Sequence, residues 1–564
     1  MRNKRVRAEI CNSKAGLSLV ERFCFSVLLL LLGILLFTLP QPNLFTVQGL
    51  PIFSYFAFIP IFLLVRMVSW KTVWLCGLLY GVGSYCLFTY WLATFHPLGI
   101  FVISFMYGLY LMLAFPLVKA AASLFPKYGW LAQWIVWCGY EYVKTLGFSG
   151  FHYGVTAYSH WRWTPMIQCT DLGGVWGLNA FIIFASAWCT AVIVDAYRFI
   201  GSNKGIRCVG KALLQGIRQH LVSLGVWFLF LVGILVYGFV SPVDYSQDET
   251  ATIALIQSNS DPWVGGLESY ERDLDTLISL SDKALLEDPS IELVVWPETA
   301  FVPRITWHYE HRYEQAKFEL IEKLLNYIDS CSVPFVIGND HGVDGYLQDG
   351  TYGVVDYNAS ILFRPGQNVN PPEPEIYFKM KLVPFTEYFP AAKTFPKLYH
   401  MLLNGDTHMW EPGTEPVVFD VNGLKFGTPI CFEDTFGFVG RRFVQNGANA
   451  FVNMSNDAWS SSLACQYQHL SMALFRSVEN RVPTVRATST GQTSIIDPNG
   501  KILDMVEPFQ ETYLIGTIPI RKDMDQTLYT RWGDYVGVIF LCLTGVSLIL
   551  GIVLKLIKKT CSTN

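Results

Sequence analysis

The stretch LVVWPETAF, residues 293–301, combines a short strand-like run with an acidic residue directly after it. Val and Trp favour extended backbone, and Pro297 ends the run, so Glu298 is expected where a buried strand becomes a loop. Further strands are expected at 251–257, 335–338, 353–363, 376–379, 425–430, 484–488 and 493–496, and helices at 268–286, 313–328 and 468–480. This alternation predicts a layered α/β domain.

The composition changes on both sides of this domain. Hydrophobic residues make up 52% of the 564-residue chain and charged residues only 15%, whereas ordinary soluble chains carry about 25% charged residues. The charge deficit lies before about residue 240 and after about residue 534. We therefore expect a membrane domain at 1–240, an inserted soluble domain at 241–533, and a return to the membrane at 534–564.

Eight apolar stretches have the length of a membrane-spanning helix, about 20 residues. They lie near 22–39, 50–67, 72–95, 99–120, 128–146, 173–195, 221–240 and 535–555. Pro51, Pro60, Glu141 and Lys144 interrupt or flank the second and fifth. The predicted fold is thus an α-helical bundle of about eight spans with an inserted α/β domain.

The distribution of basic residues predicts the orientation of these spans. The N-terminal leader is basic, as are the even-numbered connections, including residues 198–218, and the C-terminal tail at 555–559. Because Lys and Arg accumulate on the cytoplasmic side, both termini should be cytoplasmic. The inserted domain, in the seventh connection, should then lie on the outer side of the membrane.

The segment Gly147–Thr170 is rich in aromatic residues. One interpretation is an aromatic belt at the membrane surface. The other is a re-entrant or lipid-facing loop beneath the soluble domain.

Three polar residues end apolar runs in the soluble domain, namely Glu298, Lys379 and Cys431. Alone, each has a simpler explanation: a helix cap, a strand-edge lysine and a buried thiol. A net charge of -4 gives no reason to expect nucleic acid as a partner. The 13 cysteines lack C-x-x-C spacing, and Cys331 and Cys465 are expected to be unpaired rather than bridged.

Longer strings around these three residues resemble a known superfamily. VVWPETAF (294–301), KMKLVPFTEYFP (379–390) and PICFED (429–434) are similar to the nitrilase superfamily. Within it, YNAS (357–360), LVPFTE (382–387), NMSNDAWS (453–460), RATSTGQTSIIDPNG (486–500) and, in the membrane part, YGVGSYCLFTYWLATFHPLG (80–99) resemble the apolipoprotein N-acyltransferase family. The resemblance implies a nitrilase-like αββα sandwich for the inserted domain.

The resemblance also implies a role for each site residue. Glu298 would be the general base, Lys379 the oxyanion-stabilising cation and Cys431 the nucleophile. Glu387, Glu433 and Asn358 match supporting positions, and either glutamate could orient Lys379. Phe432, where many members carry Tyr, and Trp263 match positions that contact substrate.

The implied reaction is a two-step acyl transfer in the bacterial inner membrane, with the catalytic domain in the periplasm. The donor is a membrane phospholipid, which acylates Cys431 as a thioester. The acceptor is the N-terminal amine of an S-diacylglyceryl-cysteine on an apolipoprotein. Neither metal nor cofactor is expected.

Two other functions remain open at this point. A membrane-tethered amidase of the nitrilase type would keep the triad but would need only one anchor. A transporter with an outer domain would usually carry charged residues within its spans, and it would leave the triad without a purpose.

Overall fold

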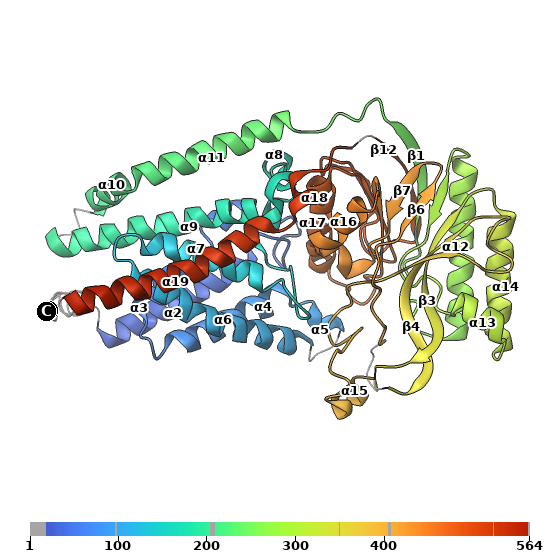
Figure 1. The fold of residues 1–564 in the computed structure, drawn as a ribbon, viewed down its shortest axis with the longest axis horizontal. Coiled ribbons are helices and arrows are strands. Elements are labelled where there is room, and N and C mark those ends of the chain that lie inside the picture. The colour runs from blue at the N-terminus through green and yellow to red at the C-terminus, as the bar shows by residue number, and fades with distance from the viewer. Residues whose placement is uncertain are drawn as a thin grey trace.

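The computed structural model describes residues 18–95, 99–203, 209–348, 350–403, 408–522 and 524–561. Helices make up one half of the molecule and two β-sheets lie at the core of the other (Figure 1). The helical half contains α2 (Leu19–Thr38), η1 (Pro51–Tyr55), α3 (Ile59–Met67), α4 (Val73–Phe88), α5 (Leu92–Phe95), α6 (Gly99–Leu124), α7 (Gly129–Val143), η2 (Thr156–His160), α8 (Thr164–Ile167), α9 (Thr170–Asn203), α10 (Val209–Gln219), α11 (Leu221–Val240) and α19 (Tyr535–Cys561).

Helices form at all eight positions predicted as spans. Five are long and apolar enough to cross a bilayer: α2, α6, α9 up to Ile200, α11 and α19. The apolar helices of 51–67 and 73–88 are shorter, and α7 has 15 residues. Several apolar helices of a membrane protein are therefore present, while the count of eight spans stays a prediction.

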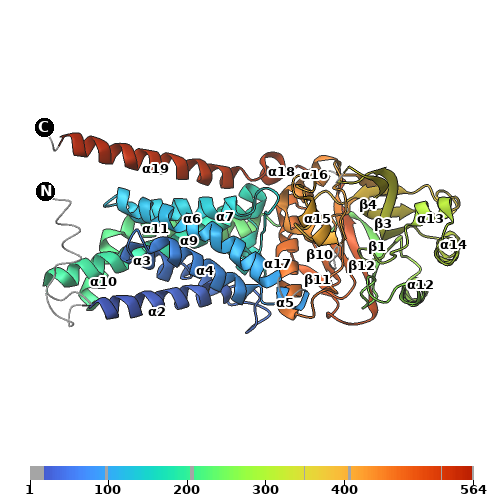
Figure 2. The same cartoon turned by 90° about the horizontal axis from the view of Figure 1, so that it is seen from below.

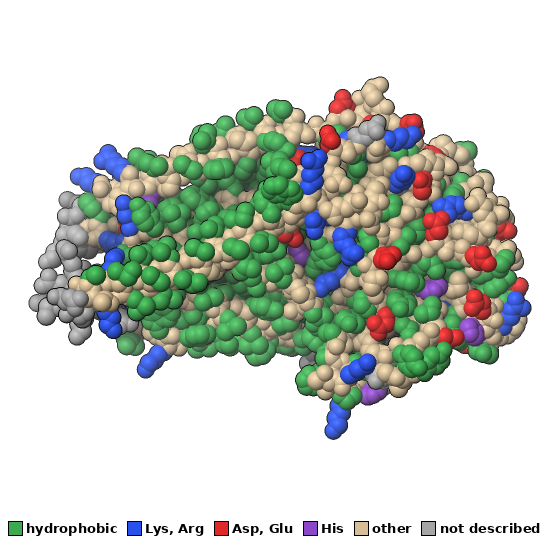
Figure 3. Space-filling model, viewed as in Figure 1, with side chains coloured by type: hydrophobic (Ala, Val, Ile, Leu, Met, Phe, Trp, Pro, Cys, Tyr) green, Lys and Arg blue, Asp and Glu red, His purple; other side chains and the backbone are tan. Residues whose placement is uncertain are grey.

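The surface of the helical half is apolar. Figure 3 shows hydrophobic side chains covering it, with charged residues concentrated over the sheets and at the far end of the helices. On α11, Leu229 is 70% exposed and Phe230 is 63% exposed, and on α19 Ile549 is 65% exposed. Hydrophobic patches of this extent are rare on soluble monomers and are typical of a lipid-facing surface.

The other half contains two six-stranded sheets. Their orders are β12-β1-β2-β3-β4-β5 and β11-β10-β9-β8-β7-β6. The strands are β1 (Glu249–Gln257), β2 (Leu293–Val295), β3 (Phe335–Tyr346), β4 (Tyr352–Phe363), β5 (Glu375–Phe378), β6 (Val418–Val421), β7 (Leu424–Gly427), β8 (Ala450–Ser455), β9 (Thr484–Thr488), β10 (Ser494–Ile496), β11 (Ile502–Met505) and β12 (Thr512–Ile520). In each sheet three central strands are parallel, β1-β2-β3 and β7-β8-β9.

Helices cover the outer faces of the two sheets. On the first sheet lie α12 (Leu267–Glu287), α13 (Ile305–His311) and α14 (Gln315–Ser330), and on the second lie η4 (Cys431–Thr435), α16 (Gly437–Gln445) and α17 (Leu463–Asn480). The remaining helices are α15 (Pro396–Leu403) and α18 (Leu528–Trp532). The layers thus follow the order helix, sheet, sheet, helix across the domain (Figures 1 and 2).

Successive side chains of β1 point to opposite faces of the first sheet and therefore enter two different hydrophobic cores. Ile253 and Leu255 belong to the core between the sheets, whereas Ala254 and Ile256 pack beneath the outer helices. All four are essentially fully buried. Because successive side chains of a strand point to opposite faces, a strand covered on both faces reads as one apolar run.

The chain leaves and re-enters the helical half on the side that faces the sheets. The last helix before the sheets, α11, ends at Val240, and β1 begins at Glu249; β12 ends at Ile520 and α19 begins at Tyr535. Both the end of α11 and the start of α19 face the sheets in Figure 1. The predicted boundaries at 240/241 and 533/534 fall in these two connections.

The aromatic segment between α7 and α9 is buried inside the protein. Tyr153 is 5% exposed, Tyr158 0% and Trp161 4%, while Trp163 remains 45% exposed. Tyr158 contacts Phe475 of α17, with ring centroids 5.1 Å apart. The interpretations as a membrane-surface belt and as a lipid-facing loop are therefore both wrong for the three buried rings, two of which contact α17.

Glu141 of α7 and Lys144, which caps this helix, hold the segment in place. Glu141 accepts hydrogen bonds from the backbone N–H of Thr156 at 3.2 Å and from its hydroxyl at 3.0 Å. Lys144 donates to the hydroxyl of Tyr85 at 3.3 Å and to the carbonyl of Tyr153 at 3.4 Å. These charged residues, which shorten the apolar run of α7, thus have partners within the protein, as buried charges require.

Candidate active site

Glu298 lies just beyond the carboxyl end of β2 and is 4% exposed. Its Oε1 accepts hydrogen bonds from Asn358 Nδ2 at 2.7 Å and from Lys379 Nζ at 3.0 Å. Its Oε2 accepts from the backbone N–H of Asn456 at 2.8 Å. The carboxylate is therefore held by three donors from three different segments of the chain.

Lys379 follows β5 directly and is fully buried. Its Nζ lies 3.0 Å from Glu298 Oε1 and 2.9 Å from Glu387 Oε1. Burial disfavours the ammonium, but the two carboxylates outweigh it and hold the pKa of Lys379 well above its usual value. The side chain is thus a fixed cation between two acidic residues.

The two supporting glutamates have different partners. Glu387 binds Lys379 through Oε1 and accepts the backbone N–H of Val383 through Oε2 at 2.8 Å. Glu433 instead accepts backbone N–H groups from Ile430 at 2.9 Å, Met380 at 2.7 Å and Lys381 at 2.9 Å. Glu387 is therefore the glutamate that orients Lys379, and Glu433 joins the loops that carry Lys379 and Cys431.

Cys431 is the first residue of η4, directly after an isolated bridge between Ile430 and Met454. Its backbone has φ +49°, a left-handed conformation that non-glycine residues adopt at a cost. The residue is 8% exposed. Burial, together with the charge of Glu298, raises the pKa of the thiol, while Lys379 acts in the opposite direction. Burial thus favours the thiol of Cys431 over its thiolate.

The remaining predicted residues fall at different distances from this centre. Asn358 joins it twice, through its hydrogen bond to Glu298 and through its carbonyl, which accepts the Lys379 N–H at 2.9 Å. Phe432 is buried, and its ring centroid lies 4.8 Å from that of Phe436.

Trp263 packs beside Trp410, whose backbone N–H donates to the carbonyl of Glu387 at 2.8 Å. The ring of Trp263 stacks on His408 with centroids 3.6 Å apart and lies 5.9 Å from Trp410. Trp410 in turn donates to Asp340 on β3 at 2.9 Å. Within the described part of the chain, the ring contacts of Trp263 are thus made with these neighbours rather than with the three central residues.

A second charged cluster, which the sequence analysis missed, lies beside Cys431. His469 on α17 is 3% exposed, and its ring contacts both Asp434, three residues after Cys431, and Asp457. Arg486 on β9 is fully buried and pairs with Asp434. Burial lowers the pKa of His469, but the two carboxylates outweigh burial and raise it to about 10.

The sequence contained one signal for this cluster. Asp434, Asp457 and Arg486 all lie in the strings that carry the family resemblance, whereas His469 lies in the predicted helix 468–480 without a motif of its own. The four residues are 12 or more positions apart along the chain. Only the packing of α17 against the second sheet brings them together.

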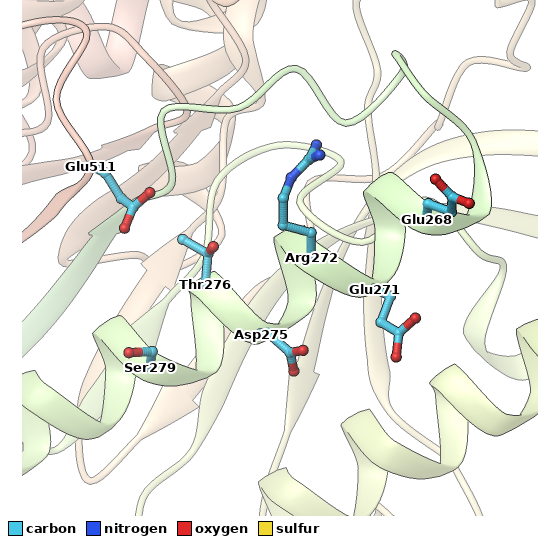
Figure 4. A pocket seen from close by; sticks show the side chains of 7 residues that line it. All are labelled: Glu268, Glu271, Arg272, Asp275, Thr276, Ser279 and Glu511. Atoms are coloured by element: carbon cyan, nitrogen blue, oxygen red, sulfur yellow. The ribbon is translucent and has the colours of Figure 1, made fainter.

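The surface hollow in Figure 4 lies apart from this centre. It is lined by residues of α12 and by Glu511, namely Glu268, Glu271, Arg272, Asp275, Thr276, Ser279 and Glu511. None of the predicted site residues is among these seven. The side chains project from an open helix face, which is the ordinary arrangement of a solvated surface.

The three central residues provide the parts of a nucleophilic centre. A thiol, a carboxylate that can accept its proton and a fixed cation are the groups that covalent acyl transfer needs. Both carboxylate oxygens of Glu298 are held by hydrogen-bond donors from other segments of the chain.

Comparison with known proteins gives the families that the chain is similar to. Residues 252–524 match the carbon-nitrogen hydrolase family, and residues 32–188 match the apolipoprotein N-acyltransferase N-terminal domain. Apolipoprotein N-acyltransferase 1 of Treponema denticola is 41% identical over 95% of this chain and 98% of its own length. The protein of the same name from Treponema pallidum is 44% identical over 92% of this chain and 95% of its own length.

A solved structure with a similar fold is Saccharomyces cerevisiae Nit3, a member of branch 10 of the nitrilase superfamily. It is 18% identical and covers 48% of this chain and 90% of its own, with a TM-score of 0.33.

Proposed function

This chain belongs to the apolipoprotein N-acyltransferase family, and we propose that it transfers a fatty acyl group from a membrane phospholipid to the N-terminal amine of bacterial apolipoproteins. The observation that carries the mechanism is the contact of Lys379 with Glu298 and Glu387 beside the strained Cys431. The acceptor is the amine of an S-diacylglyceryl-cysteine.

In the first step Glu298 takes the thiol proton while the Cys431 sulfur attacks the ester carbonyl of the phospholipid. The ammonium of Lys379 offsets the negative charge that develops on the carbonyl oxygen. When the intermediate collapses, the ester C–O bond breaks and Glu298 returns its proton to the leaving alkoxide. The products are a lysophospholipid and a thioester on Cys431.

In the second step the lipoprotein amine attacks the thioester carbonyl and Glu298 accepts a proton from the amine. The C–S bond breaks, an amide forms, and the proton returns to the Cys431 sulfur. One carboxylate thus serves both half-reactions, as in other double-displacement enzymes. The raised pKa of Cys431 explains why a base is required at neutral pH.

The helical half gives this reaction access to its substrates. Donor and acceptor both carry acyl chains, and each buried CH₂ costs about 0.8 kcal/mol to bring into water. A catalytic domain attached to apolar helices avoids that cost by working at the bilayer surface. A membrane-tethered amidase for small amides would have no use for such extensive lipid-facing surface, so this alternative is not favoured.

The orientation in the membrane is part of the proposal. The catalytic domain, residues 241–533, faces the periplasm of the bacterial inner membrane, and both termini are cytoplasmic. Alkaline phosphatase, active only after export, should be active when fused near residue 300 and inactive when fused at Gly205. The reverse pattern would overturn the orientation.

The covalent intermediate tests the reaction itself. Protein incubated with phospholipid and no acceptor should gain the mass of one acyl chain, removable by neutral hydroxylamine. Cys431→Ser should gain no thioester, because a hydroxyl is far less acidic than a thiol. Cys331→Ser and Cys465→Ser are matched controls: both cysteines are free, and both variants should retain the adduct. An adduct that persists in Cys431→Ser and disappears in a control would identify a different nucleophile.

A further inference from the structure

The helix α17 connects the catalytic centre with the membrane half of the protein. The side chain of Gln468 donates to the carbonyls of Pro42 at 2.8 Å and Phe88 at 3.1 Å, and it accepts from Trp91 Nε1 at 2.9 Å. The next residue, His469, points into the catalytic domain. These three hydrogen bonds attach α17 to the membrane half at the residue before His469.

Both nitrogens of the His469 ring have carboxylate partners. Nε2 lies 2.9 Å from Asp434 Oδ1 and 3.3 Å from the Cys431 carbonyl, and Nδ1 lies 3.1 Å from Asp457 Oδ1. A carboxylate only accepts hydrogen bonds, so both ring nitrogens must donate, which only the imidazolium can do. The ring therefore bridges the turn that carries Cys431 and the loop that carries Asp457.

The Asp457 loop leads directly to the general base. The preceding residue, Asn456, donates its backbone N–H to Glu298 Oε2 at 2.8 Å. The carbonyl of Asp457 is itself held by Gln466 Nε2 at 3.1 Å. Consequently His469 connects the nucleophile, through one short loop, to the carboxylate that must accept the nucleophile's proton.

The charges around the ring balance only if His469 is protonated. Asp434 on η4 and Asp457 after β8 supply two negative charges, and Arg486 on β9 supplies one positive charge. The other titratable groups facing this cluster are Tyr153, Cys465 and Cys431. The charge of Asp457 disfavours a thiolate at Cys431. A cationic His469, 3.1 Å from Asp457, opposes that effect.

We propose that His469 is a positioning residue, which as a buried imidazolium sets the placement of Cys431 relative to Glu298 and neutralises the carboxylates beside the nucleophile. The inference rests on the proposed acyl transfer, in which these two residues exchange a proton. His469 touches neither substrate in this scheme and acts through its contacts with Asp434, Asp457 and the Cys431 carbonyl.

The test uses the full-length protein in phospholipid nanodiscs, with the variants His469→Gln, Asp457→Asn and the double variant. Two quantities are measured: the single-turnover rate of thioester formation, and the pH profile of Cys431 alkylation by iodoacetamide. The second needs no lipid substrate. His308→Gln is the matched control, since His308 is also buried and lies 3.5 Å from a glutamate, but on the distant α13. Thermal unfolding of each variant monitors folding.

His469→Gln should slow thioester formation about 10²-fold, the cost of a small misplacement of reacting groups. It should also move the alkylation profile about one pH unit upward, because two carboxylates then face one cation. The double variant restores charge balance and keeps an amide donor between the two positions. It should recover to within about tenfold of the parent rate, with the alkylation profile restored.

Three results would overturn the inference: a His469→Gln protein that forms the thioester within twofold of the parent rate, a double variant no faster than the single one, or equal losses in His308→Gln. If the parent forms no lipid thioester while the alkylation profiles shift as described, the acyl-transfer proposal fails and the positioning role stands. If the thioester forms in the parent and in His469→Gln at equal rates, only the positioning role fails.

Discussion

The first sheet supplies Glu298, Lys379 and Glu387 to the centre, whereas the second sheet and α17 supply Asp434, Asp457, His469 and Arg486. In the first cluster two carboxylates share one cation. In the second, two carboxylates meet two cations. Both clusters are buried beside the same thiol, so their different charge balance is the informative feature.

The first cluster holds one carboxylate more than it has cations, so in the proposed mechanism Lys379 keeps Glu387 as its partner while Glu298 carries the thiol proton. The second cluster has no such excess: each carboxylate already faces a cation, and removing either charge leaves its partner unpaired in a low-dielectric site. In the proposed mechanism the first sheet thus supplies the groups that transfer the proton, and the second sheet holds the turn of Cys431 in place.

Replacing the base should have the largest effect. Glu298→Gln keeps the volume and one acceptor oxygen but removes the proton acceptor, so single-turnover thioester formation should fall about 10²–10⁴-fold. The variant should remain folded, as judged by thermal unfolding. A rate within a few-fold of the parent would show that Glu298 does not accept the proton and that the first cluster, like the second, has only a structural role.

Breaking the second cluster should mainly reduce stability. Arg486→Met leaves Asp434 with one cation instead of two, and loss of one partner of a buried ion pair typically costs about 3–5 kcal/mol. Denaturant unfolding in detergent measures this loss. Lys323→Met is the control: Lys323 pairs with Asp275 on the surface, where such pairs contribute about 0–1 kcal/mol. Equal losses in the two variants would contradict the structural role of Arg486.

Glu387→Gln should have a smaller effect, and on catalysis rather than folding. A hydrogen bond to a charged group contributes about 1.5–3 kcal/mol, so a mobile Lys379 should slow thioester formation about 10–100-fold. Glu433→Gln provides the contrast: Glu433 binds backbone N–H groups and its loss should appear chiefly as a lower unfolding temperature. If Glu387→Gln mainly lowered the unfolding temperature and Glu433→Gln mainly slowed thioester formation, the roles of the two glutamates would be reversed.

The smallest effect concerns the pH dependence of stability. The pKa of His469 rises from 6.5 to about 10 on folding, so between these values the folded state binds one more proton than the unfolded state. Its stabilising contribution is complete below pH 6.5 and is lost as the pH rises toward 10, with a slope of about 1.4 kcal/mol per pH unit. Comparing the parent with His469→Gln between pH 7.5 and 8.5 should show a flatter dependence in the variant. Parallel curves would mean that the ring is not protonated.

Local patterns predicted most of the first sheet. The predicted strand at 251–257 falls within β1, and the predicted helix at 268–286 falls within α12. Four strands were not predicted, namely β6, β8, β11 and β12. Every residue of β8 is buried, so the polar alternation that identifies a half-exposed strand is missing there.

Motifs in the sequence predicted the residues of the site, but the contacts between these residues could be assigned only from the fold. The structure brings Glu298, Lys379 and Asn358 into direct contact, as their shared family strings suggested. The sequence could not tell whether Glu387 or Glu433 binds Lys379. The path of the loop before each glutamate cannot be derived from the spacing of the residues. In the structure Glu433, two residues after Cys431, accepts backbone N–H groups, and it is Glu387 that binds Lys379.

The sequence by itself determined that this protein has apolar helices and an inserted α/β domain, because hydropathy and strand period are properties of neighbouring residues. It also identified the three central residues, because each lies in a continuous string. Only the tertiary structure decided that Tyr153, Tyr158 and Trp161 are buried in protein rather than lipid. It alone decided that His469 is a cation, because that charge depends on two carboxylates that the chain brings together from 12 and 35 residues away.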